Sequence, residues 1–400
     1  MNNLIQNSVF LSALLYYSVY FFAYQFFKKA DKSFSKRKTK LFLFAGMMLL
    51  CLFAGLRGTS VGTDTYRTVL YRFNNTNENA SLGSVLSRGI SEPLLVIIPY
   101  FIKKIINDYR VFLFVLQALT IAPIGVVTYK LKDRASIHIM MLVYMLLFFP
   151  ISLNVMRQSI AAAWLLLALV SFLDKNYLKA AILTLLSTYF HGSVLIGVVL
   201  FAVVYFLFTN RNKALKAAFL FSALILSYLI LSRWRALATW VISEGILTDE
   251  YSSYIGLMSG ETVSSKTSFH YRTLVAELLR LFSALIVLAS THRKNEVLNN
   301  KDIMLYLWSI LASLAIFSVF ALFFHTYLGD RFTLYLDYSQ IPLYGLLIGR
   351  HQIKNTNYQK RRVLRIPTSL SRLSMVYCFA FNLFMFVIIG YGDTVPYIFG

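Results

Sequence analysis

Long apolar stretches separated by short polar ones run through nearly the whole chain. The stretches are about 14 to 24 residues long, and helices of that length match a hydrocarbon core of roughly 30 Å. They lack the apolar–polar alternation of a membrane β-barrel strand. The pattern predicts an all-α integral membrane protein with about twelve transmembrane helices (11 to 13), built as a single polytopic domain over residues 1–400. The predicted spans are 8–27, 41–56, 110–129, 136–153, 156–173, 177–190, 193–208, 214–232, 271–290, 303–324, 331–349 and 372–391.

Composition agrees with this class. The hydrophobic share of 58% is more than a soluble domain can bury, and the charged share of 14% is well below the usual one. The amino-terminal "MNNLIQNSVF" lacks the basic region and cleavage site of a secretory signal, so the first apolar run is expected to remain as a span. Cys51 and Cys378 both lie in apolar runs, where a thiol behaves as a small hydrophobe and no disulfide is expected.

The basic residues gather in alternate loops. The formal net charge is +22, but its clusters lie between apolar runs, as topology signals do, so no nucleic-acid partner is predicted. One set of alternate loops holds 24 of the 39 lysines and arginines and is placed in the cytoplasm, which puts both termini on the outer side. These loops are 28–40, 130–135, 174–179, 209–216, 291–302 and 350–366.

The segment "EPLLVIIPYFIKKI", residues 92–105, is apolar but short and carries Lys103 and Lys104 near its end. A full span here would invert every later loop and place the basic 350–366 loop outside, against the positive-inside rule. It is therefore predicted to be a re-entrant or interfacial helix.

Two larger outer excursions, 57–109 and 233–270, are expected to form part of an active-site cavity. The sequence lacks a Gly-rich phosphate loop with its Lys-Ser or Lys-Thr pair, a G-x-S-x-G elbow, zinc-spaced His or Cys residues, and a D-x-D metal–nucleotide motif. ATP-driven transport and nucleotide-sugar chemistry are disfavoured accordingly, and no metal or cofactor is predicted.

Charged residues recur at the outer helix ends. Arg157, in "SLNVMRQSIAAAW", begins a helix, where a lipid-facing guanidinium would be costly; it either faces a polar cavity or snorkels to the interface. His191, in "FHGS", lies at the turn between two short arms, which would sink it below the outer interface. It is either a catalytic group or a satisfied structural one.

Further outer-face groups extend this pattern. Arg331 follows Asp330 at a turn in "GDRFTLYLDY", with Tyr335 one turn along the next helix. Arg233 and Arg235 flank an outer helix end as interfacial anchors or phosphate contacts, and Arg280 can pair with Glu277 three residues earlier. Guanidinium groups bind phosphate with paired donors, so the set suits an anionic amphiphile such as a lipid-linked diphosphate.

With these residues in view, the chain resembles the EpsG family of bacterial polysaccharide polymerases, which are akin to Wzy polymerases. The resemblance covers nearly the whole chain, and its six motifs occur in the same order as in the family. It rests on "RGTSVGTDTYRTVLYRF", "SEPLL", "NVMRQSIAAAW", "KNYLKAAILTLLSTYFHGS", "GDRFTLYL" and "VPYIF".

The resemblance implies a membrane-embedded glycosyltransferase of GT-C-like architecture in the bacterial inner membrane. Its substrate would be an undecaprenyl-diphosphate-linked oligosaccharide repeat unit, joined at the outer face into O-antigen, capsule or exopolysaccharide. Arg57 and Asp64 match the R-G-x-x-V-G-x-D-T pattern. His191, Asp64 and Arg157 would be catalytic, with His191 or Asp64 as the base; diphosphate and glycan would be bound by Arg57, Arg331, Arg233, Arg235, Arg280 and Tyr335.

Two other functions stay open. An O-antigen ligase uses the same donor with another acceptor, and the motif order fits it less well. A lipid-linked oligosaccharide flippase would need a charged path through the bilayer and a pseudo-symmetric repeat, neither of which is evident. Whether a Wzz-like chain-length regulator binds is also open.

Overall fold

The computed structural model describes residues 9–87, 92–210, 212, 214–215, 301–319, 328–348, 368–388, 390, 394–395 and 397. These residues form helices and connecting loops without any β-strand, as the apolar pattern predicts. Among the described residues, five helical stretches are long and apolar enough to cross a membrane: Val9–Lys32, Lys36–Gly55, Tyr109–Leu131, Ile137–Asn154 and Met156–Leu173. The chain is therefore a helical, membrane-embedded protein.

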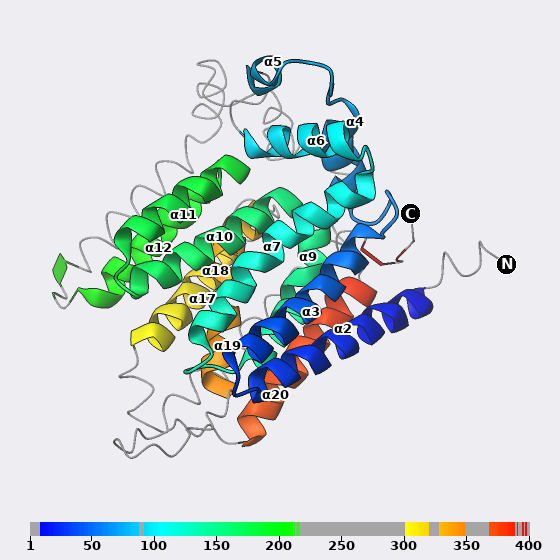
Figure 1. Cartoon of the computed structure of the whole chain (residues 1–400). Coiled ribbons are helices and arrows are strands. Elements are labelled where there is room, and N and C mark those ends of the chain that lie inside the picture. The colour runs from blue at the N-terminus through cyan, green and yellow to red at the C-terminus, as the bar shows by residue number, and fades with distance from the viewer. Residues whose placement is uncertain are drawn as a thin grey trace.

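The first half of the bundle is built from long helices that pack side by side. Helix α2 packs along α3, α3 along α7, and α7 along α10 (Figure 1). The stretch 137–154 forms α8, a π-helical turn η2 and α9, and the chain then breaks at Val155 before α10. The bounds are α2 Val9–Lys32, α3 Lys36–Gly55, α7 Tyr109–Leu131, α8 Ile137–Val143, η2 Tyr144–Phe148, α9 Phe149–Asn154 and α10 Met156–Leu173.

The second half adds shorter helices. The polar turn "FHGS" separates α11 from α12, and the predicted span 331–349 is divided into α18 and α19. Pro342 explains this division, because a proline inside a continuous helix would clash with the carbonyl four residues earlier and lacks an N–H to donate. The bounds are α11 Tyr177–Phe190, α12 Val194–Thr209, α17 Lys301–Val319, α18 Leu328–Asp337, α19 Gln340–Ile348, α20 Thr368–Asn382 and η5 Leu383–Ile388.

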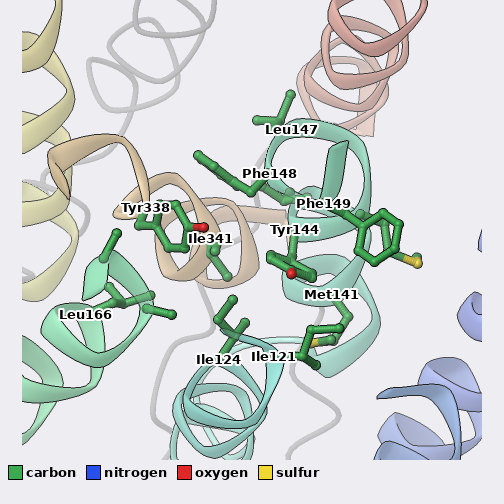
Figure 2. Packing of buried hydrophobic residues seen from close by; sticks show 14 of the residues in the cluster. Ile121, Ile124, Met141, Tyr144, Leu147, Phe148, Phe149, Leu166, Tyr338 and Ile341 are labelled. Carbon is green, nitrogen blue, oxygen red and sulfur yellow. The ribbon is translucent and has the colours of Figure 1, made fainter. Parts of the chain in front are cut away.

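Each predicted span outside residues 211–300 overlaps one of these helices or a run of two or three consecutive ones. The predicted spans 214–232 and 271–290 lie outside the described residues, apart from 214–215. The stretch 137–154 and α10 are mostly buried by other helices, whereas only 28% of the α2 window is buried. Side chains of α7, η2 and α10 meet residues of the α18–α19 turn in this core, including Ile121, Phe148, Leu166 and Tyr338 (Figure 2).

One end of the bundle, here called the loop end, carries the long connection between α3 and α7. This connection contains η1 Thr65–Leu70, α4 Tyr71–Asn74, α5 Leu82–Ser87 and α6 Leu94–Ile105. Twelve residues of α6 rise only ~18 Å, too little to cross a bilayer. Figure 1 shows α6 lying across the loop end, at an angle to α7, α10 and α11, as expected of an interfacial helix.

The segment around Thr394–Tyr397 lies at the same end. The hydroxyl of Tyr16 donates to the Thr394 carbonyl over 2.8 Å, and the Tyr397 backbone N–H donates to the Ser12 hydroxyl over 2.8 Å. The Tyr397 ring stacks on Phe53 with centroids 4.3 Å apart. A segment distant in sequence is thereby fastened between the ends of α2 and α3.

Candidate active site

A loop following α3 lies against the break between α9 and α10. The carbonyl of Leu153, just before the break, accepts hydrogen bonds from the Arg57 guanidinium and the Thr65 hydroxyl, each over 3.2 Å. Gly62 has a φ of +89°, and a β-carbon placed on it would lie 2.7 Å from the same carbonyl oxygen. A glycine is needed here because the loop must both adopt this backbone angle and approach closely.

The same contact places Asp64. Its backbone N–H donates to the Asn154 side-chain oxygen over 2.8 Å. Its carboxylate oxygen Oδ2 lies 3.6 Å from Nη2 of Arg331, and each side chain of this pair is about one-third exposed. Two positions predicted as site residues, Asp64 of the α3–α7 connection and Arg331 of α18, are therefore brought together.

Arg57 does not project from the loop as the sequence interpretation expected. Its side chain is fully buried, and it donates to the Ala54 carbonyl over 3.2 Å and to the Met156 sulfur over 3.0 Å, besides Leu153. Burial lowers its pKa to about 10, opposed by the nearby Tyr16 and Tyr397 phenols, so it stays charged at neutral pH. The guanidinium fastens the loop from beneath.

Glu92, two residues before α6, is the centre of a second cluster. Its Oε2 lies 2.8 Å from Nη1 of Arg72 in α4 and 2.7 Å from Nη1 of Arg157 in the first turn of α10. Its Oε1 lies 2.6 Å from Nδ1 of His191, in the turn between α11 and α12. Four elements thus meet on one carboxylate, which we call the Glu92 cluster (Arg72, Glu92, Arg157, His191).

The Glu92 cluster is partly screened from solvent. The Glu92 side chain is 7% exposed, the His191 side chain 14% and each arginine 25%. Burial raises the pKa of Glu92, but the His191 hydrogen bond and the charges of Arg157 and Arg72 outweigh burial and lower it to about 2. Glu92 is therefore ionised at neutral pH, and its one negative charge is shared by two guanidinium groups.

The Glu92 cluster and the Asp64–Arg331 pair are joined through α10 and α12. The Gln158 amide, next to Arg157, donates to the Arg331 backbone carbonyl. Ser193, two residues after His191, has its hydroxyl 2.6 Å from that of Tyr335, one turn after Arg331. Tyr335 itself is buried between helices, so in this conformation its ring packs in the bundle instead of forming an exposed glycan platform.

The remaining predicted residues are not placed. Arg233, Arg235 and Arg280 lie outside the described residues, together with the whole 233–270 excursion. Within the part of the chain that the structure describes, no group of three or more His, Cys, Asp and Glu side chains is arranged to hold a metal ion.

Sequence reasoning did not select Glu92 and Arg72. Each lies in a different short segment, and no spacing along the chain connects positions 72, 92, 157 and 191. The signal that was present is the lone acidic residue of "SEPLL", which opens the apolar segment 92–105. An isolated carboxylate beside an apolar helix at the membrane surface indicates a specific partner.

Comparison with known proteins gives one family assignment. The model of the EpsG family matches residues 40–399, which include the Glu92 cluster and the Asp64–Arg331 pair. The searches of curated proteins and of solved structures gave no match. Because the matched region is most of the sequence, the chain belongs to the EpsG family, a Wzy-like family of the polymerase type.

Proposed function

We propose that this protein polymerises a bacterial surface polysaccharide by joining undecaprenyl-diphosphate-linked oligosaccharide repeat units at the outer face of the cytoplasmic membrane. The observation that carries the proposal is the Glu92 cluster, which gathers two arginines and a histidine at one end of a membrane bundle. Membership of the EpsG family supports a polymerase-type activity.

The proposal includes the full architecture: about twelve spans, a GT-C-like arrangement, and both termini on the outer side. It is supported by the overlap of the described helices with the predicted spans. It is also supported by the basic loops 28–40, 130–135 and 174–179, the fully described ones, which lie at the end of the bundle opposite the loop end. In this arrangement the loop end faces outward and α6 lies at the outer interface. A lipid-linked substrate would then present its diphosphate at the depth of the Glu92 cluster.

The charges of the Glu92 cluster suit a diphosphate. In the Glu92 cluster two guanidinium groups, those of Arg72 and Arg157, face one carboxylate, and His191 adds a ring that can carry a proton. Guanidinium keeps its charge when partly dehydrated and matches phosphate oxygens with paired donors. Such groups stabilise the negative charge that builds on the leaving diphosphate as the glycosidic bond breaks.

The second pair would handle the sugars. Asp64 and Arg331 are both part-exposed, so carboxylate and guanidinium can both bind hydroxyl groups of the glycan. Arg233, Arg235 and Arg280 remain proposed contributors to the diphosphate site. For Arg57 and Tyr335 the burial described above supports a different role, namely holding the loop and the α12–α18 contact in place. The donor is preassembled on its lipid, so this transfer needs neither a nucleotide nor a metal.

The test is the size distribution of surface glycan from the source strain, with the gene deleted and then restored as wild type, Arg157→Ala or His191→Ala. Polymerase function predicts single repeat units in the deletion strain, a restored ladder with wild type, and no ladder with either variant. His138→Gln, at the opposite end of the bundle, is the control variant and should restore the ladder. Long chains accumulating on the carrier lipid in the deletion strain would instead identify a ligase.

A further inference from the structure

The two oxygens of Glu92 have different partners. Oε2 faces both arginines, at 2.8 Å and 2.7 Å, and Oε1 faces only Nδ1 of His191, at 2.6 Å. A carboxylate at the junction of α4, α6, α10 and the α11–α12 turn thus fixes one imidazole nitrogen and two guanidinium groups at once.

This geometry determines the histidine tautomer. An ionised carboxylate only accepts hydrogen bonds, so the hydrogen between Oε1 and Nδ1 belongs to the imidazole. Glu92 is ionised at neutral pH because its pKa is lowered to about 2. When His191 is neutral, its lone pair is therefore on Nε2, the ring nitrogen that does not face Glu92.

We propose that Glu92 is a positioning residue that makes His191 Nε2 the base for the acceptor hydroxyl, an inference that rests on the proposed polymerase function. A carboxylate behind an imidazole holds the ring in one orientation and stabilises the imidazolium formed when it takes a proton. It also holds Arg72 and Arg157 on its other oxygen, so that positive charge lies in the same cluster for the departing diphosphate.

The transfer forms one glycosidic bond and breaks one bond to the diphosphate. The oxygen of an acceptor hydroxyl attacks the anomeric carbon of the donor sugar and forms the new glycosidic bond. The bond between that carbon and the diphosphate oxygen breaks, and its electron pair leaves on the diphosphate. The hydroxyl proton moves to Nε2 of His191, which later releases it to water.

The alternative base, Asp64, has a different set of contacts. Its carboxylate faces a guanidinium at 3.6 Å, and its backbone is held by Asn154. The Asp64 carboxylate therefore already has a cation beside it, whereas Nε2 of His191 does not face Glu92 and carries the lone pair of the neutral ring. The geometry thus favours Asp64 as a partner of Arg331 and the glycan, and His191 as the base.

The structure offers a matched control. His138 Nδ1 lies 2.7 Å from Oδ2 of Asp31 at the opposite end of the bundle, which is the same kind of contact, and no described arginine is paired with that carboxylate. Asp31→Asn therefore removes a carboxylate from a histidine just as Glu92→Gln does, but away from the site. It should leave the rate of polymerisation within about twofold of wild type, as a surface-end substitution does.

The experiment uses the full chain in native membrane vesicles, with the lipid-linked repeat unit extracted from a strain lacking the gene. Initial rates of glycosidic bond formation are measured from pH 5 to pH 9 for wild type, Glu92→Gln, Asp64→Asn and Asp31→Asn. We expect Glu92→Gln to lower kcat by about 10²-fold or more, the usual contribution of a positioned base, with a smaller change in KM.

The acidic limb of the pH–rate profile separates positioning from a structural role. The charged groups facing His191 in the cluster are Glu92 and, through it, Arg72 and Arg157. Removing the carboxylate while keeping both arginines destabilises the imidazolium, so the limb should move to lower pH by at least about one unit. Asp64→Asn should slow the reaction but leave the limb where it is in wild type.

A further measurement covers the case in which Glu92→Gln does not accumulate in the membrane. His191→Ala is assayed with added imidazole, which should restore part of the rate in proportion to its neutral form. Absence of rescue, an unmoved limb in Glu92→Gln, or a limb lost in Asp64→Asn would each overturn the inference. Failure of the proposed function itself would look different, because wild-type vesicles would then form no polymer at all.

Discussion

Gly62→Ala should displace the loop that carries Asp64 from the α9–α10 break. The glycine has a φ of +89°, and its added β-carbon would lie 2.7 Å from the Leu153 carbonyl oxygen and 2.9 Å from the Thr65 hydroxyl. A non-glycine residue in that backbone region costs about 1–3 kcal/mol. The loop can relieve the overlap only by moving away from α9, which weakens the Thr65 and Asp64 hydrogen bonds by about 1 kcal/mol each.

These magnitudes predict a measurable local effect. A loss of about 1–3 kcal/mol in the free energy of loop opening corresponds to hydrogen exchange faster by about 5- to 150-fold. The assay is hydrogen–deuterium exchange of a peptide containing Asp64, whose amide donates to Asn154, alongside ladder formation in cells. Both readouts should change, because the loop positions Asp64 against Arg331.

Gly192→Ala is the matched control for this prediction. Gly192 also lies in a turn at the loop end, but a β-carbon there would meet nothing within 4 Å, and its φ is not positive. Exchange and ladder formation should therefore stay near wild type. If Gly62→Ala behaved like Gly192→Ala in both assays, the argument that the loop is held against the α9–α10 break would be refuted.

Three other outcomes follow from described contacts. The pKa of Glu92 is lowered to about 2 from 4.5, so its ionisation stabilises the fold above about pH 4.5, and this contribution is lost as the pH falls toward 2. The difference in unfolding free energy between wild type and Glu92→Gln should therefore narrow by about 2 kcal/mol when the pH is lowered from 7 to 3. Tyr335→Phe removes the hydroxyl that bonds Ser193 and should lower stability by about 1 kcal/mol, an effect that thermal unfolding in detergent would detect and that should be smaller in a Ser193→Ala background. Gly197→Ala would place a β-carbon 2.7 Å from Cβ of Tyr335, so overpacking by about 1–3 kcal/mol should lower the melting temperature, and an unchanged one would contradict the close α12–α18 contact.

The helices could be predicted because length and apolar character suffice to identify a membrane span. The predicted edges at 156–173 and 177–190 are the observed ones, since polar turn residues bound both helices. The prediction of one continuous helix over 331–349 was wrong, because Pro342 was counted as part of an apolar run. The segment is divided into α18 and α19. The sequence did place Arg157 and His191 correctly at helix ends facing one end of the bundle.

The candidate site was only half predictable, for a physical reason. Helix ends can be assigned from one stretch of sequence, whereas the Glu92 cluster depends on how four separate elements pack. The residues next to a loop arginine in the sequence also do not determine whether its side chain points into the bundle or out of it. Arg57 was predicted to face the substrate, but the carbonyls at the end of α3 and at the α9–α10 break draw it inward.

The fastening of Thr394–Tyr397 has a consequence for how the protein matures. Tyr397 and Ser12 are 385 positions apart, yet Tyr397 stacks on Phe53 beside the buried Arg57 on which the Asp64 loop rests. The ribosome must translate all the residues between Ser12 and Tyr397 before Tyr397 can make these contacts. A chain that is inserted only as far as its middle helices therefore carries Arg57 and the Asp64 loop without the Phe53–Tyr397 contact that completes their support.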